Sequence, residues 1–321
     1  MVIYRHGFSF SVIVSNVFLD KNIFFKGEKT MRRILSIFLA ITTVFGMTLA
    51  FASCGNNTKT DISNAKSLAD LAGAKISAQS GTFHEQAREQ IENVQGQVYN
   101  TFDAMLEALR TGAIDGYIAE EPTALSVCYK DKTLDYVHLK NNDTGFTATD
   151  ADVAIAIGCK KGSALVAQIN TVLATISTEQ RNALMDQIVR ANAGETITEF
   201  AVSNSAPATT TGTLKVAMEC AYDPYNWTQR DASNGAVPIY SEGSKGLYAN
   251  GYDVQIAKYV ANALGLKLEI YAVEWDSLIE GVKTGVYDAI VAGMSPTAER
   301  AEQIDFTDIY YTSNLVIIYK K

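Results

Sequence analysis

One structural unit is encoded twice, as FDAMLEALRTGAIDGYIAE at residues 102–120 and as WDSLIEGVKTGVYDAIVAG at residues 275–293. In each copy, apolar residues at i, i+3, i+4 and i+7 predict a helix, a glycine ends it, and a short buried strand follows. Aligned without a gap, the copies share Asp103/Asp276, Glu107/Glu280, Thr111/Thr284, Gly112/Gly285, Asp115/Asp288 and Ala119/Ala292. Because the matches include the stop and the strand, we predict two related lobes.

Helices and strands alternate around both repeats. We expect strands near 74–79, 96–100, 114–119, 152–158, 213–218, 267–273, 287–292 and 314–320. We expect helices near 83–92, 103–111, 121–130, 253–264, 276–284 and 297–303. This alternation predicts an α/β fold of two lobes, each a mainly parallel sheet flanked by helices. Ligands bind such sheets beyond the carboxyl ends of their strands, where Glu120 and Gly293 end the two repeats.

The N-terminal region has the pattern of an export signal. Met31-Arg32-Arg33 precedes an uncharged apolar run over 34–51, and FASCG at 51–55 resembles a lipobox. We expect 31–53 to be a lipoprotein signal peptide, Cys54 to be acylated and 54–63 to be a tether. An uncleaved anchor helix is the alternative. Residues 1–30 are interpreted as an untranslated or mis-assigned extension, with translation starting at Met31.

Charge and cysteine usage exclude several classes of protein. Six of the 27 Lys and Arg and two of the 35 Asp and Glu precede Cys54, which leaves 21 basic and 33 acidic residues and a formal charge of −12. No basic stripe is left for nucleic acid or anionic lipid. Cys128, Cys159 and Cys220 lack metal-type spacing and are an odd number, so we expect core residues rather than disulfides or a zinc site. No metal or cofactor is expected.

Two segments are suited to bind an anion. Ser295 can cap the helix expected near 297–303, and Arg300 one turn later can present a fork to a carboxylate. In the other lobe, Thr82 opens a helix whose first N–H groups, on Phe83 and His84, could face the same carboxylate. The alternative is a capped helix with an ordinary surface arginine. For His84 we expect a structural or solvent-facing role rather than a catalytic one.

A zwitterion also needs a partner for its ammonium group. Glu120 at the end of the repeat strand is the natural partner, with a solvated rim charge as the alternative. Tyr222 and Trp275 could form an apolar slot, and Glu219 could pair with a terminal cation. Plain core packing is the alternative for Trp275.

These segments together closely resemble the polar amino-acid-binding proteins of bacterial ABC importers. The most specific stretches are GYDVQIAKYVANALG at 251–265 and EWDSLIEGVKTGVYDAIVAGMSPTAERAEQIDFTDIYY at 274–311. The resemblance implies a two-lobed, hinge-closing periplasmic-binding-protein-like fold of type 2. It also implies site roles: the ligand carboxylate is held by Arg300 with Ser295 and Thr82, the α-amine by Glu120, the side chain by Tyr222 and Trp275, and a carbonyl comes from Gly293.

The order of the segments differs from the family. Family members begin with the segment found here at 212–321 and continue into the one at 64–192, so the chain looks circularly permuted. Residues 193–212, rich in Ala, Ser, Thr and Asn, would link the ancestral termini. We expect 64–157 to form lobe II and 158–321 lobe I, with a single covalent crossing near 152–158. Deleting Val316–Lys321 should then loosen closure more than it damages either core.

The expected function is that of a monomeric solute-binding lipoprotein outside the cytoplasmic membrane. It would capture a free polar amino acid, basic such as arginine or lysine, and deliver it to an ABC permease with its ATPase. Glutamine, histidine and cystine are alternative ligands. From other classes, a dehydratase-type enzyme on the same scaffold and a ligand-sensing receptor module are alternatives.

Overall fold

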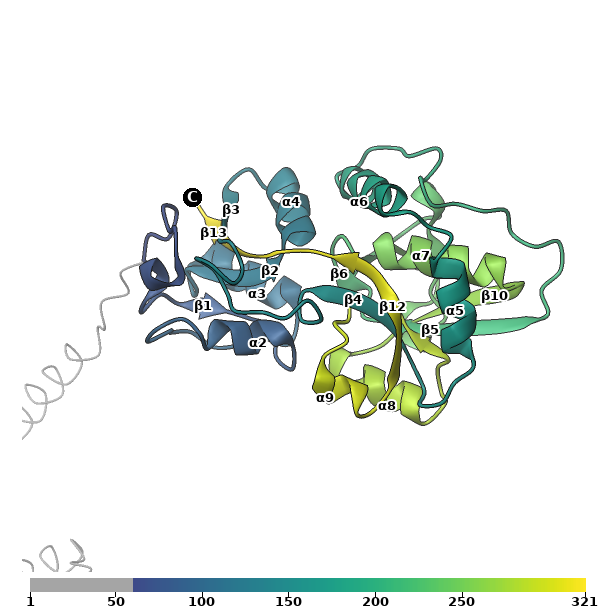
Figure 1. Cartoon of the computed structure of the whole chain (residues 1–321). Coiled ribbons are helices and arrows are strands. Elements are labelled where there is room, and N and C mark those ends of the chain that lie inside the picture. Colours follow the sequence, from purple (N-terminus) through teal and green to yellow (C-terminus); the bar gives the residue numbers. More distant parts are fainter. Residues whose placement is uncertain (1–59) are drawn as a thin grey trace, which may run out of the picture. The chain divides into compact units, whose positions relative to one another are not determined.

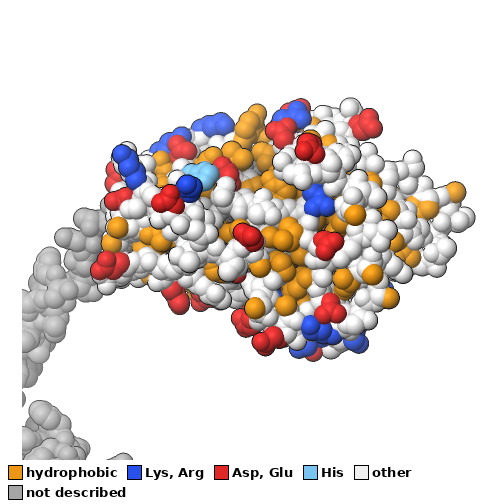
Figure 2. Space-filling model, viewed as in Figure 1, with side chains coloured by type: hydrophobic (Ala, Val, Ile, Leu, Met, Phe, Trp, Pro, Cys, Tyr) orange, Lys and Arg blue, Asp and Glu red, His pale blue; other side chains and the backbone are white. Residues whose placement is uncertain are grey.

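The computed structural model describes residues 60–321. The predictions for the extension 1–30, the signal peptide, Cys54 and most of the tether therefore lie outside the described residues. None of the helices between residues 60 and 321 combines the length and the apolar character needed to cross a bilayer. On the face shown in Figure 2, acidic and basic side chains are interspersed and form no continuous basic stripe.

A small lobe is built on a four-stranded sheet in the order β1-β2-β13-β3 (Figure 1). Its strands are β1 (Ile76–Ser77), β2 (Gly116–Glu120), β3 (Leu134–His138) and β13 (Leu315–Lys320). Its helices are η1 (Leu68–Leu71), α2 (Phe83–Arg88), α3 (Phe102–Thr111) and α4 (Glu121–Lys130). Ile118 of β2 and Ile317 of β13 are fully buried in its core.

A large lobe is built on a five-stranded sheet in the order β10-β5-β11-β4-β12. Its strands are β4 (Ala154–Cys159), β5 (Gly212–Met218), β10 (Leu266–Ala272), β11 (Ala289–Ile290) and β12 (Asp305–Thr312). Its helices are α5 (Leu165–Leu173), α6 (Thr178–Asn192), α7 (Tyr252–Ala263), η4 (Trp275–Ser277), α8 (Leu278–Lys283) and α9 (Ala298–Ala301). An antiparallel sheet, β6 (Ala221–Tyr222), β7 (Asn226–Gln229), β9 (Tyr248–Asn250) and β8 (Val237–Pro238), completes it together with η2 (Ser233–Gly235) and η3 (Glu242–Ser244).

The predicted repeat is confirmed, and its shared residues have the same roles in both lobes. Asp115 accepts a hydrogen bond from the Lys75 amide at 2.9 Å, and Asp288 accepts one from the Lys215 amide at 2.8 Å. Each aspartate thus ties the start of its strand to the neighbouring strand. Gly112 ends α3 in the left-handed region, at φ 76°, which a glycine adopts without steric cost.

Three expectations about the sheets are wrong. The sheets are mixed, because β4 pairs antiparallel with β11 and β12, and β13 pairs antiparallel with β2 and β3. Residues 315–320 belong to the small lobe, although they were expected to be part of the large lobe. The chain therefore passes between the lobes twice, at 139–153 and at 313–314 (Figure 1). Residues 96–100 form no strand, and Tyr99 alone among them makes an isolated bridge, to Gln79.

The two presumed connectors are partly packed against the fold. In the expected tether, Ile62 is 2% exposed and belongs to the small-lobe core. In the expected linker, Phe200 and Val202 are buried, and the Asn204 side chain donates to the Tyr259 carbonyl at 2.9 Å. We call residues 195–204 the strap, because this segment runs along α7.

The core placement expected for Cys128, Cys159 and Cys220 is confirmed. Cys159 and Cys220 are buried in the core, Cys128 is half-buried against it, and none of the three forms a disulfide. Between residues 60 and 321, no group of His, Cys, Asp and Glu side chains is arranged to hold a metal ion.

The place of β13 changes the expected effect of losing the C-terminal strand. Ile317 has no exposed surface and pairs with both β2 and β3, so Ile317→Ala should lower the free energy of unfolding by about 3 kcal/mol. Deleting Val316–Lys321 should unfold the small lobe. Val286→Ala, at a 55% exposed position, is the control and should change stability by less than about 0.5 kcal/mol. Urea unfolding measures the stability of each variant. Equal losses of stability in Ile317→Ala and Val286→Ala would contradict the placement of β13 in the small-lobe core.

Candidate ligand-binding site

Residues from both lobes line one small cavity. The small lobe contributes Gln79, Thr82, Phe83, His84 and Glu120, and the large lobe contributes Tyr222, Trp275, Gly293, Ser295 and Arg300. Eight of the nine residues expected to bind ligand are therefore brought together, all except Glu219. The cavity volume is about 20 Å³, space for roughly one water molecule. The two lobes thus meet closely around these side chains.

The Arg300 guanidinium bridges the lobes without a carboxylate partner. Arg300 is 8% exposed; its Nη1 donates to the Ser295 carbonyl at 2.9 Å, and its Nη2 donates to the Gly81 carbonyl of the small lobe at 3.0 Å. Its guanidinium carbon also lies 5.1 Å from the centre of the Trp275 ring. Burial lowers the pKa of Arg300 to about 10, so the side chain remains charged at neutral pH. Among residues 60–321, no acid lies within ion-pair distance of it.

Across the cavity, Glu120 is also buried, and only one of its oxygens has a partner. Its Oε1 lies 3.0 Å from Nε2 of His84, while Glu120 Oε2, His84 Nδ1 and the Tyr222 hydroxyl are buried without a hydrogen-bond partner among the described residues. Buried polar atoms are normally satisfied, so each of these atoms needs an explanation. His84 is 6% exposed, which rules out the solvent-facing alternative.

The aromatic residues are arranged differently from the expected slot. Tyr222 stacks on Phe102, with ring centroids 4.2 Å apart and an interplanar angle of 10°, and not on Trp275. Trp275 instead packs beside Arg300 and directs its Nε1 toward the Gly81 carbonyl at 3.4 Å. Phe102 and Trp275 are the first residues of the two repeats, so each repeat supplies one ring to this region. Because Phe102 aligns with Trp275, which was expected to contact ligand, the repeat alignment could have identified Phe102 as a site residue. Phe102 was not among the residues predicted to bind ligand.

The helix that carries Arg300 begins later than expected. Thr297 is the N-cap of α9, with its side chain accepting from the Arg300 amide, whereas the Ser295 hydroxyl donates to the Asp152 carbonyl at 3.0 Å. Thr82 caps α2 as expected, accepting from the His84 amide at 3.2 Å. Gly293 has φ 61°, and an added Cβ would lie 2.9 Å from the Tyr222 ring, so a side chain there would displace the ring.

Glu219 lies next to the cavity rather than in its wall. Its carboxylate accepts from the Gln79 side chain at 3.2 Å, a further direct contact between the lobes. The pKa of Glu219 is raised to about 7, chiefly by burial and to a smaller extent by the nearby acids Glu274, Asp276 and Asp103, while the Gln79 hydrogen bond opposes the rise. This end of the site is therefore acidic.

The chain is similar to known solute-binding proteins over part of its length. Residues 214–321 match the model of the bacterial extracellular solute-binding proteins, family 3. The arginine-binding extracellular protein ArtP of Bacillus subtilis is 42% identical over 71 residues, 22% of this chain and 28% of that protein. The L-cystine-binding protein TcyA of the same organism is 31% identical over 110 residues, 34% of this chain and 35% of that protein. A probable histidine-binding protein of Campylobacter jejuni is 34% identical over 118 residues, 37% of this chain and 39% of that protein.

Solved structures give similarities of the same kind. An ancestral arginine-binding protein bound to glutamine is 32% identical over 32% of this chain and 39% of that chain, with a TM-score of 0.25. The chain spans about a third of the length of the curated relatives it matches. The matched segment, which runs from β5 to β13 and contains Arg300, relates the chain to the family 3 solute-binding proteins.

The raised pKa of Glu219 makes stability depend on pH. Its folded-state pKa of about 7 lies above the ordinary glutamate value of 4.5, so the folded protein binds a proton more tightly than the unfolded chain does. Stability therefore falls as pH rises from about 4.5 to 7. Glu219→Gln keeps an acceptor for Gln79 and removes this fall. We expect the wild type to lose about 2 kcal/mol relative to the variant between pH 5 and pH 8. Parallel curves of unfolding free energy against pH would contradict the assignment.

Proposed function

We propose that this chain captures a free amino acid between its two lobes. The observation that carries the proposal is a buried arginine without an acid partner facing a buried glutamate with a free oxygen. Arg300 and Glu120 line the same cavity from opposite lobes. A ligand with one carboxylate and one ammonium group would satisfy both, and buried charges are stable only when paired in this way.

Binding would require the lobes to separate first. A cavity of about 20 Å³ cannot hold an amino acid, so contacts between the lobes must break. Among them are the bonds of Arg300 and Trp275 to the Gly81 carbonyl, the bond of Gln79 to Glu219, and the ion pair of Lys130 with Asp223 at 2.6 Å. The two passages at 139–153 and 313–314 would act as the hinge. On closure, the ligand carboxylate would replace the Gly81 carbonyl at Nη2 of Arg300, a charge-assisted bond in place of a neutral acceptor.

We infer that the ligand side chain is basic, as in arginine or lysine. Glu219 and the acids around it, Asp103, Glu274 and Asp276, make one end of the site electronegative. Closing the lobes brings these carboxylates together, and a cationic side chain would offset their repulsion. The name of ArtP supports this choice, whereas relatives named for cystine and histidine keep those two ligands as alternatives. Glutamine is the third alternative expected from the sequence.

We propose further that the protein is a lipid-anchored monomer that serves an ABC permease and its ATPase. The support is the FASCG segment at 51–55, together with relatives named as extracellular, periplasmic or ABC transporter proteins. Cys54 would carry the lipid on the outer side of the cytoplasmic membrane. Labelling cells with an alkyne fatty acid should mark the wild type and not Cys54→Ser.

We infer that the segment order is circularly permuted, with 193–212 joining the ancestral termini. The family match at the C-terminal third supports this order. A second support is that Asp61 and Ser63 line one surface cavity together with Tyr319, Lys320 and Lys321, so the two described ends of the chain lie close together.

Restoring the family order tests the permutation. A chain that begins near 205, runs to Lys321 and continues through a short glycine linker into 60–204 should fold and bind the same ligand with similar affinity. The matched control is a circular chain in which the same linker joins residue 321 to residue 60 and the strap region stays uncut. A reordered chain that is insoluble while the cyclic control folds would count against the inference.

A second candidate, a dehydratase-type enzyme, is favoured by the buried His84–Glu120 pair in the cavity, which could move a proton. Arogenate and prephenate are the substrates to test. We expect either compound to be recovered unchanged after incubation with the protein.

Removing the Arg300 cation should abolish amino-acid binding. Thermal-shift screening against the twenty amino acids identifies the ligand, and Arg300→Met should then weaken its binding by at least about 100-fold, because a buried charged hydrogen bond to the carboxylate is lost. Arg181→Met, an arginine that donates to the Ile309 and Leu173 carbonyls away from the cavity, is the control and should bind normally. Unchanged affinity in Arg300→Met would disprove the proposed site.

A further inference from the structure

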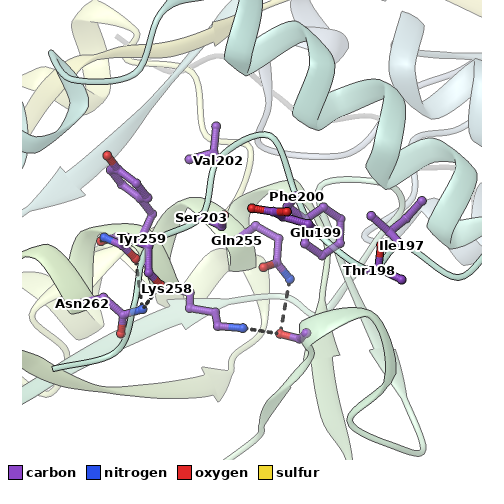
Figure 3. Close-up of a pocket in the computed structure, with 12 residues that line it drawn as sticks. Ile197, Thr198, Glu199, Phe200, Val202, Ser203, Gln255, Lys258, Tyr259 and Asn262 are labelled. Carbon is purple, nitrogen blue, oxygen red and sulfur yellow. Dashed lines mark hydrogen bonds between the residues drawn. The ribbon is translucent and has the colours of Figure 1, made fainter. Parts of the chain in front are cut away.

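A second pocket lies in the large lobe, between the strap and α7 (Figure 3). Its volume is about 280 Å³, close to the lower end of the range for small-molecule sites. The strap supplies Ile197 to Phe200 and Val202 to Asn204, and α7 supplies Gln255, Lys258, Tyr259 and Asn262. None of these residues lines the cavity between the lobes, so this pocket is separate from the proposed amino-acid site.

The base of this pocket holds an ammonium group without an acid partner. Lys258 is half-buried, and its Nζ donates to the Gly235 carbonyl at 3.2 Å, where Gln255 Nε2 also donates at 3.3 Å. Figure 3 shows the two side chains converging on that carbonyl. Burial lowers the pKa of Lys258, and no acid among the described residues offsets this effect. A half-buried cation held by one neutral acceptor is stabilised by an anion.

The remaining walls indicate what kind of anion fits. Phe200 and Val202 are buried and form an apolar side, while the Ser203 hydroxyl at the exposed rim has no hydrogen-bond partner among the described residues. The pocket contains one ammonium group and no arginine fork or cluster of helix-terminal N–H groups of the kind that holds a phosphate. One cation beside an apolar wall suits a monocarboxylate with a short apolar tail. Glu199 lies at the exposed rim and would repel an anion weakly.

We propose that the pocket between the strap and α7 binds a small monocarboxylate, with Lys258 holding the carboxylate and Phe200 contacting the tail. The strap is the segment that would join the ancestral termini, so this site would be a property of the permuted arrangement rather than of the cleft. Bound ligand would tie the strap to α7 and stabilise the large lobe by mass action.

Butyrate is the probe, and ligand-observed NMR titration of the full chain is the measurement. Lys258→Met keeps the apolar stem and should weaken butyrate binding about tenfold. Ser203→Glu, at an exposed position, places a second carboxylate at the rim and should weaken binding about two- to threefold without affecting folding. Glu199→Gln should strengthen binding by about two- to threefold. Lys215→Met, an exposed lysine on β5, is the matched control and should bind normally.

Arg300→Met separates this pocket from the cavity between the lobes and should leave butyrate binding intact. If Lys258→Met fails to fold, Ser203→Glu carries the test. The proposal is overturned by any of four results: no saturable butyrate signal, full affinity in both Lys258→Met and Ser203→Glu, loss of binding in Arg300→Met, or tighter binding of inorganic phosphate than of butyrate.

Discussion

A guanidinium that is buried yet still charged constrains the whole arrangement. Even with its pKa lowered to about 10, Arg300 keeps its proton at neutral pH, so its N–H groups must find acceptors. One acceptor, the Ser295 carbonyl, is in its own lobe, and another, the Gly81 carbonyl, is in the small lobe. The lobes are therefore joined by a contact that a carboxylate would make more strongly, and under the proposed function this would couple closure to ligand binding.

The duplicated unit brings one strand end from each lobe to the cavity between them. In each lobe an aspartate, Asp115 or Asp288, fixes the start of a strand, and that strand delivers its final residues to the space between the lobes. Glu120 ends one strand, and Gly293 follows the other, where its positive φ lets the chain pass the Tyr222 ring. The two copies of the pattern thus supply Glu120 from the small lobe and Trp275 and Gly293 from the large lobe, while the other lining residues, Arg300 among them, come from neighbouring segments.

Local patterns allowed much of this to be predicted. The helices near α3, α4 and α7 and the repeat follow from periodicity, glycine stops and strand ends. Eight of the nine residues expected to bind ligand line one cavity, and their expected roles came from helix caps, strand ends and the family resemblance together. The rest depends on partners distant in sequence. The apolar run of β13 has the same pattern whichever sheet it joins, and only its pairing with β2 and β3, both distant in sequence, places it in the small lobe. Likewise, only the tertiary fold reveals that Tyr222 stacks on Phe102 and that His84 reaches Glu120.

The central claim is that one ligand supplies both an anion to Arg300 and a cation to Glu120. Calorimetric titration with the best-bound amino acid, its decarboxylated analogue and its N-acetyl analogue examines each charge separately while the protein stays unchanged. The account predicts that either analogue binds at least about 100-fold more weakly than the parent amino acid, because each leaves one buried charge unpaired. Binding of both analogues with affinities close to that of the parent would contradict it.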